Sequence, residues 1–239
     1  MIALFTDFGI DGPWIGQVEA VLHQHAPGVS VINLFSDLPL FDVEAAACLL
    51  PAYITHFPAG AVFLCVVDPG VGSQRPGVVV QADGRWFVGP NEGLFVQLVR
   101  QSHKVACWQL PDVVQASRSF HARDVFAPVA ARLACDGRVT GEKIEIAVLD
   151  QPDWPDDLER IVYIDHFGNA ITGMRACNIE PSTIVRVTGH TLRSAQIFSA
   201  VNVGEAFWYE NSNGLVEIAV NKGRANEVLD LMVGTVIGV

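Results

Sequence analysis

The clearest acid–base pair in the sequence stands at the two ends of one short segment, residues 68–75, which reads DPGVGSQR. Asp68 directly follows an apolar run, 61–67, and Arg75 ends the segment. Loops at the carboxyl ends of parallel strands bind ligands in open α/β sheets, so this carboxylate and guanidinium are well placed for catalysis. A structural turn closed by an Asp–Arg ion pair is an equal alternative. Phosphate binding is disfavoured, because the segment has no Gly-Lys-Ser/Thr ending.

A histidine is the second candidate. His121 stands just before a predicted helix, 122–135, where it can handle a proton, bind a metal or play a purely structural part. Asp124 fits equally well as a favourable charge in the first turn of that helix. No other His or Cys stands at ligand spacing from His121, so a metal site is not expected.

Three further polar motifs are TDFG (6–9), DHFGN (165–169) and NSNG (211–214). Asp7 follows the first predicted strand, where a carboxylate can bind a ribose diol. The match of Asp-Phe-Gly to protein kinases is coincidental, since the other kinase elements are missing. Each C-terminal motif, taken alone, fits a hairpin turn rich in Asn and Asp.

Alternating apolar patterns predict the elements that must position these residues. Predicted strands cover 2–5, 29–34 and 61–67, and 78–82 with 85–88 form a predicted hairpin around Asp83-Gly84. Predicted helices cover 16–24, 42–55, 93–100 and 122–135. This alternation predicts an α/β fold, with an N-terminal three-layer α/β/α domain built on a mostly parallel sheet.

A segment rich in Pro and Asp predicts a linker at 151–159, between an N-terminal domain at 1–150 and a C-terminal domain at 160–239. The second domain has short strand-like runs and no convincing helix, which predicts a small β-barrel. These runs are 160–164, 184–187, 206–209 and 216–220.

Composition excludes several classes of protein. The chain of 239 residues is 50% hydrophobic and has no apolar run near the roughly 20 residues that cross a bilayer, nor a basic N-terminal segment. We therefore expect a cytoplasmic globular protein with no membrane partner. A net charge of −11 without clustered Lys or Arg disfavours nucleic acid. The five cysteines form no C-x-x-C pair, which predicts mostly buried free thiols.

Five motifs follow one another along nearly the whole chain: TDFG, DPGVGSQR, FHARDVFAP (120–128), DHFGN and NSNG. In this order they closely resemble the S-adenosylmethionine (SAM) hydroxide adenosyltransferases, also called SAM hydrolases, which are relatives of the SAM-dependent fluorinase and chlorinase. The resemblance implies an N-terminal α/β domain, a C-terminal β-barrel and a homotrimer. It also implies that substrate lies between the N-terminal domain of one subunit and the C-terminal domain of its neighbour.

The resemblance further implies roles for single residues. Asp68, Arg75 and His121 match the hydrolytic set of the family, and Asp7 matches the residue that binds the ribose hydroxyls. The other matches are substrate contacts: Phe41 as an aromatic against the substrate, Phe198 and Asn169 on the adenine and methionine sides, and Asp165 and Ser212 at the amino and carboxylate ends of methionine.

Two positions depart from the family pattern. Asn213 stands where the halogenases have a basic residue, which leaves the partner of the methionine carboxylate open. The segment 35–38, FSDL, replaces a Thr-His pair that is common in the family.

These matches imply in-line attack of water at the ribose C5′ of S-adenosyl-L-methionine, giving adenosine and L-methionine without a cofactor. Asp68, held ionised by Arg75, orients the water, and either Asp68 or His121 takes its proton. A halide-using adenosyltransferase is the nearest alternative, but the carboxylate of Asp68 repels an anion. A non-catalytic SAM or adenosine binder is the other alternative, and binding alone would not require all three hydrolytic residues.

Overall fold

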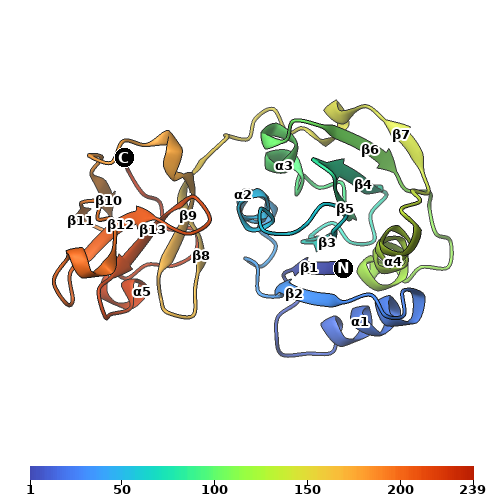
Figure 1. Cartoon of the computed structure of the whole chain (residues 1–239), viewed down its shortest axis with the longest axis horizontal. Helices are drawn as coiled ribbons and strands as arrows, with labels where there is room; N and C mark the ends of the chain where they lie inside the picture. Colours follow the sequence, from blue (N-terminus) through green and yellow to red (C-terminus); the bar gives the residue numbers. More distant parts are fainter. The chain divides into compact units, whose positions relative to one another are not determined.

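The apolar runs of the N-terminal half assemble into one seven-stranded sheet (Figure 1). The computed structural model describes residues 1–239, and the chain divides into two units, Met1–Asp153 and Trp154–Val239. The sheet belongs to the first unit, with the spatial order β2-β1-β3-β5-β4-β6-β7. Its strands are β1 (Ile2–Thr6), β2 (Val31–Phe35), β3 (Val62–Val66), β4 (Gly77–Ala82), β5 (Arg85–Pro90), β6 (Val105–Gln109) and β7 (Glu142–Ile144).

This sheet is mixed. The pairings β2-β1, β1-β3 and β3-β5 are parallel, whereas the pairings β5-β4, β4-β6 and β6-β7 are antiparallel. The predicted α/β fold is confirmed, but the prediction of a mostly parallel sheet was wrong. The Asp83-Gly84 turn, with positive φ at both residues, reverses the chain as the sequence predicted. The sheet then grows along β4 through two strands, β6 and β7, that the apolar pattern did not reveal.

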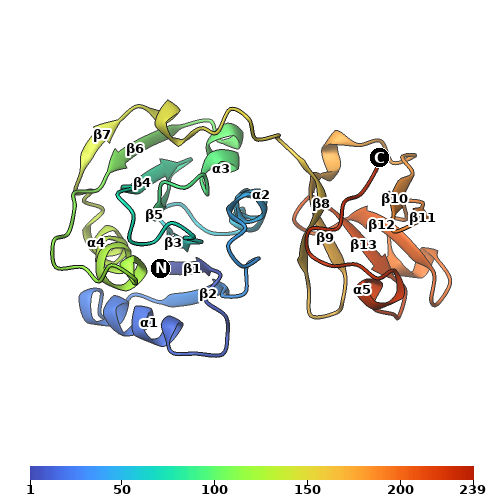
Figure 2. The same cartoon turned by 180° about the vertical axis from the view of Figure 1, so that it is seen from behind.

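Helices cover both faces of the sheet (Figure 2). The helices of this unit are α1 (Trp14–His25), α2 (Val43–Tyr53), α3 (Val96–Gln101) and α4 (Ala127–Asp136). On one face, α1 and α4 pack against each other and bury Ile2 and Leu4 of β1. On the other face, Phe63 stacks on Phe87 with 5.0 Å between ring centroids, and Phe95 at the start of α3 packs against Phe87.

The predicted helix 122–135 consists of two parts. A π-helical turn, Ala122–Phe126, leads directly into α4, so His121 lies at the start of the wider turn. Single π turns are rare and occur often at functional sites. Asp42 begins α2 as predicted, since its Oδ1 accepts a hydrogen bond from the Ala45 backbone at 3.0 Å.

The second unit holds a four-stranded antiparallel sheet of order β12-β13-β9-β8 and a two-stranded hairpin, β10-β11. The strands are β8 (Leu158–Ile164), β9 (Ala170–Arg175), β10 (Val185–Val187), β11 (His190–Leu192), β12 (Ala206–Glu210) and β13 (Leu215–Val220), followed by a short helix, α5 (Ala225–Val228). The predicted β architecture is confirmed, with β9 and β11 added. The ladders of these two sheets do not close on themselves, so the predicted barrel stays a prediction.

The free thiols were predicted correctly, and none of the cysteines forms a disulfide. Cys48, Cys65 and Cys107 are buried, as expected, whereas Cys135 and Cys177 are exposed. None of the helices combines the length and the apolar character that crossing a bilayer requires.

Candidate active site

Three carboxylates follow three neighbouring parallel strands. Asp7 follows β1, Asp68 follows β3 and Glu92 follows β5, and these strands lie side by side in the sheet. Parallel strands present their carboxyl ends at the same edge of the sheet, which is where α/β proteins bind ligands. The fold therefore brings acidic groups from distant parts of the sequence to one edge.

Asp68 and Arg75 form an ion pair in which Arg75 Nη2 donates to Asp68 Oδ2. The two side chains are only 7% and 8% exposed. The other carboxylate oxygen, Asp68 Oδ1, is buried and has no hydrogen-bond partner. An unpaired buried acceptor costs about 1–3 kcal/mol, and a purely structural turn gains nothing that offsets this cost. The arrangement favours a carboxylate that is held at one oxygen and can accept a hydrogen bond at the other.

Glu92 is a second carboxylate on the same guanidinium, with its Oε1 2.9 Å from Arg75 Nε. A glycine at position 70 makes room for it, since a Cβ there would lie 2.4 Å from Glu92 Oε1. Burial raises the pKa of the Asp68 carboxyl, Arg75 opposes this rise and Glu92 adds to it. Glu92 thereby shifts Asp68 towards a more basic carboxylate.

Aromatic contacts hold the chain around His121. The ring of the preceding residue, Phe120, packs edge-on against Phe8 and Trp14, with centroids 6.0 and 5.2 Å away. The guanidinium of Arg123 lies 5.0 Å from the centre of the Phe120 ring. The packing of the Phe120 ring therefore restrains the backbone next to His121.

A small cavity of about 110 Å³ brings four of the predicted residues together: Asp7, Phe41, Asp68 and His121. The rest of its wall is largely apolar. Its remaining lining residues are Phe8, Val66, Val71, Ser119, Phe120 and Ala122. A cavity of this volume holds only part of a typical ligand, since small-molecule pockets usually measure about 300–1,000 Å³.

Asp7 and Phe41 are joined at the edge of this cavity. The Phe41 backbone N–H donates to Asp7 Oδ2 at 3.2 Å, and Phe41 adopts the left-handed conformation with φ of 62°. Its side chain is 72% exposed. Burial raises the pKa of Asp7, and the hydrogen bond from Phe41 partly offsets this rise. A strained backbone that presents an exposed aromatic ring is typical of ligand sites.

A second cavity, of about 580 Å³, adjoins Arg75 and His121. Of these two cavities, Asp68 lines the small one, Arg75 lines the large one and His121 lines both. The walls of the large cavity are mostly polar and include Ser73, Gln74 and Arg118. No group of three or more His, Cys, Asp or Glu side chains is arranged to hold a metal ion.

The predicted residues of the second unit come from three segments of the chain. Asp165 and Asn169 meet at the β8-β9 turn, where Asp165 accepts hydrogen bonds from the backbone and side chain of Asn169 at 2.8 and 3.2 Å. Both lie near a buried carboxylate, Glu217, whose oxygens accept from Tyr209 Oη at 2.5 Å and Asn211 Nδ2 at 2.9 Å. Burial raises the pKa of Glu217, and the charge of Asp165 adds to the rise.

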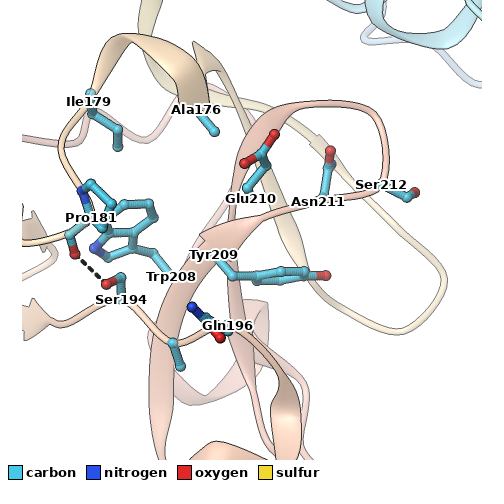
Figure 3. A pocket seen from close by; sticks show the side chains of 11 residues that line it. Ala176, Ile179, Pro181, Ser194, Gln196, Trp208, Tyr209, Glu210, Asn211 and Ser212 are labelled. Carbon is cyan, nitrogen blue, oxygen red and sulfur yellow. Dashed lines mark hydrogen bonds between the residues drawn. The ribbon is translucent and has the colours of Figure 1, made fainter.

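Phe198 and Ser212 come from two other segments, and each adjoins a hydrogen-bond donor of Glu217: Phe198 packs against Tyr209, and Ser212 follows Asn211 in the chain. The Phe198 ring packs edge-on against Phe207 and Tyr209, at 5.2 and 5.4 Å between centroids. Ser212 lines a third cavity, of about 420 Å³ (Figure 3). Figure 3 shows Glu210, Asn211 and Ser212 along the end of β12, with Trp208 beside Pro181, whose carbonyl accepts from the Ser194 hydroxyl.

Sequence reasoning missed two acidic residues at these sites, the buried Glu217 and the half-buried Glu92. A lone Glu in the apolar run 215–220 was a readable signal for Glu217, because an unpaired carboxylate is costly in a core strand. The signal for Glu92 was weaker. It required the knowledge that β5 lies parallel to β3, which places the residues after both strands at one edge.

Comparison with known proteins identifies the family. A model for the N-terminal domain of SAM hydroxide adenosyltransferases matches residues 2–142, and the model for their C-terminal domain matches residues 159–238. The chain is 36% identical to the (R)-S-adenosyl-L-methionine hydrolase of Thermus thermophilus, over 98% of this chain and 96% of the relative.

Two further matches are more distant in sequence. An uncharacterized conserved protein from Thermotoga maritima superposes with a TM-score of 0.87 at 27% identity, over 99% of this chain and 98% of the other. A fluorinase from Nocardia brasiliensis is 23% identical over 92% of this chain and 90% of its own length. With both domain models matched over most of its length, this chain belongs to the SAM hydroxide adenosyltransferase family.

Proposed function

We propose that this protein is a SAM hydrolase, which converts S-adenosyl-L-methionine and water into adenosine and L-methionine. The activity for which the Thermus thermophilus relative is named supports this, since the similarity extends over nearly the full length of both chains. Within the structure, the observation that carries the proposal is the Asp68 carboxylate, paired with Arg75 through one oxygen and unpaired at the other.

The chemistry requires little beyond a well-placed water. The sulfonium of SAM leaves as a neutral thioether, so sulfur needs no proton. Asp68 Oδ1 accepts a hydrogen bond from the water and holds it in line with the C5′–S bond. Such positioning can contribute several kcal/mol, and a positioned base contributes about 10²–10⁴-fold. His121, on the wall of the same cavity, accepts or relays the proton.

Water is favoured over halide at this site. Asp7 and Asp68 both line the small cavity, and ionised carboxylates a few ångströms from an anion repel it strongly in a poorly solvated site. The fluorinase is also a more distant relative, at 23% identity against 36% for the hydrolase. A binding protein without turnover is the other alternative. Binding alone would not require all three of Asp68, Arg75 and His121.

The sulfonium of SAM is pyramidal and therefore occurs as two epimers. The name of the Thermus thermophilus relative specifies the (R) form. We infer that this chain also prefers the (R) epimer. Attack at C5′ must occur opposite the departing sulfur, so inverting the sulfur redirects the methionine arm and changes its contacts while the ribose stays in place.

The test is to incubate purified protein separately with each sulfonium epimer and to resolve adenosine by chromatography. We expect adenosine and methionine in equal amounts, formed faster from the (R) epimer. Adenosine from neither epimer overturns the proposed activity. Equal rates from both overturn only the epimer preference.

The remaining substrate contacts are proposed on the resemblance to the family. Asp7 binds the ribose hydroxyls and Phe41 packs against the substrate. In the second unit, contacts to adenine and methionine come from Asp165, Asn169, Phe198 and Ser212. We also propose a cytoplasmic homotrimer with shared sites, a linker at 151–159 and a C-terminal barrel. Light scattering combined with activity measured on dilution tests the trimer, and a fully active monomer overturns it.

A further inference from the structure

The Asp68–Arg75 ion pair stands at the junction of two cavities of different character. Asp68 faces the small cavity of about 110 Å³, whereas Arg75 faces the polar cavity of about 580 Å³. His121 contributes to the walls of both. The ion pair therefore separates the two cavities, and His121 is in contact with both of them.

The proposed reaction requires a route for water and protons that is separate from the space filled by the substrate. SAM carries a positive charge at sulfur, and both products are neutral at the reacting atoms. Hydrolysis therefore releases one proton in each turnover. The small cavity has a largely apolar wall, including Phe8, Phe41 and Phe120, and the reacting end of the substrate would fill it. Water must enter, and the proton must leave, by another route.

The large cavity has the properties of that route. Its volume accommodates several waters at about 30 Å³ each, and its polar walls offer them hydrogen-bond partners such as Ser73 and Gln74. Arg75 adds a buried donor, Nη1, which has no partner among the protein atoms. Buried polar groups of this kind are commonly satisfied by ordered water. The charged residues along this wall include Arg118 and Asp112, both near the surface.

We propose that the large cavity is a water compartment that supplies the attacking water and receives its proton through His121. This rests on the proposed hydrolysis of SAM. In the reaction the water oxygen bonds to C5′, and the electron pair of the C5′–S bond leaves on the methionine sulfur. The water proton passes to the imidazole of His121, either directly or from Asp68. The second imidazole nitrogen then releases a proton to water in the large cavity.

Two neighbouring residues provide a matched test in the full-length protein. Ala116 lines the large cavity, whereas Gln115 is exposed and is not part of its wall. Ala116→Trp fills part of the compartment, and Gln115→Trp adds the same ring outside it. We expect Ala116→Trp to lower kcat by at least about tenfold with KM within about threefold, because it impedes the exchange of water and protons and leaves substrate binding untouched. Gln115→Trp should keep both constants.

A solvent isotope effect separates blocked proton transfer from distortion of the site. In Ala116→Trp, the ratio of kcat in H₂O to kcat in D₂O should rise, because proton release becomes rate-limiting. The smaller variant Ala116→Leu should show the same changes to a lesser degree and should bind adenosine like the wild type by calorimetry. Wild-type turnover in Ala116→Trp overturns the proposal, and so does a lower kcat with an unchanged isotope effect. If the wild-type protein forms no adenosine, the proposed function itself fails, which is a separate outcome.

Discussion

Glu92 and Asp68 share one guanidinium, that of Arg75. Asp68 pairs with Nη2, and Glu92 Oε1 lies 2.9 Å from Nε. Two carboxylates on one cation leave the group with a net negative charge when all three are ionised. The positive charge of Arg75 is thus divided, and Asp68 is less strongly held in its ionised form than in an isolated pair. If Asp68 acts as proposed, Glu92 makes it a better base by raising its pKa.

Replacing Glu92 by Gln tests this role. Glu92 contributes to the raised pKa of Asp68, so Glu92→Gln should lower that pKa. Since Asp68 must be ionised to work, the rate falls as pH drops through its pKa, and the acid limb of the kcat profile should move to lower pH. Above that limb, kcat should fall by about threefold to tenfold, because a less basic carboxylate is a weaker acceptor. KM should not change.

The control is Glu142→Gln, which removes an equal charge from an exposed position in β7. Its pH profile should match that of the wild type. An acid limb that stays in place or moves to higher pH in Glu92→Gln would show that Glu92 does not tune Asp68.

Asp68 itself is tested by Asp68→Asn, which keeps the shape of the side chain and removes its charge. Adenosine should still bind, because the proposed ribose contact, Asp7, is untouched. The chemical step should slow by at least about 10²-fold, the lower range for a positioned base. Calorimetry with adenosine beside single-turnover kinetics measures the two effects separately. Adenosine formation at the wild-type rate would mean that Asp68 is only a turn residue, and the mechanism would then depend on His121.

The variant Phe41→Gly separates the effect of backbone strain at this residue from the effect of its proposed contact with the substrate. Its φ of 62° suits glycine better than phenylalanine, and its side chain is 72% exposed, so little burial is lost on removal. In Phe41→Gly we expect the free energy of unfolding to stay level or rise by up to about 1 kcal/mol, as relief of strain offsets the entropy of the unfolded glycine. KM should rise by about tenfold, because an aromatic contact with substrate is lost. Chemical denaturation and steady-state kinetics measure both, and a large loss of stability would show that Phe41 is a packing residue.

No metal should be needed for turnover. The sulfonium releases a neutral thioether without a Lewis acid, and in the proposed mechanism Asp68 and His121 activate the water. Protein treated with a chelator and then desalted should keep its rate, as judged by adenosine release. If one particular divalent ion restores a lost rate, the role assigned to Asp68 is wrong.

The sequence by itself determined the features that depend on short stretches of chain. Local backbone preference and side-chain patterning depend only on residues that are close in the chain. They account for the Asp83-Gly84 turn, for the Asp42 cap of α2 and for the apolar strands of the sheet. The family was also readable, because five short motifs in a fixed order identify it, and both domain models match. Asp7, Asp68 and His121 were named from those motifs and Phe41 from the match to the family, and the four meet at one cavity.

Only the tertiary structure decided how distant segments pair. Strands β6 and β7 lack a strong apolar alternation. They form strands because β6 pairs with the edge of β4 and β7 then pairs with the edge of β6. Glu92 reaches Arg75 because β5 lies parallel to β3, although β4, which comes between them in the chain, is antiparallel to β5. Likewise, the large cavity at His121 depends on how the segment 110–118 lies relative to Arg75. Such contacts depend on packing free energy summed over the whole sheet, which no local pattern encodes.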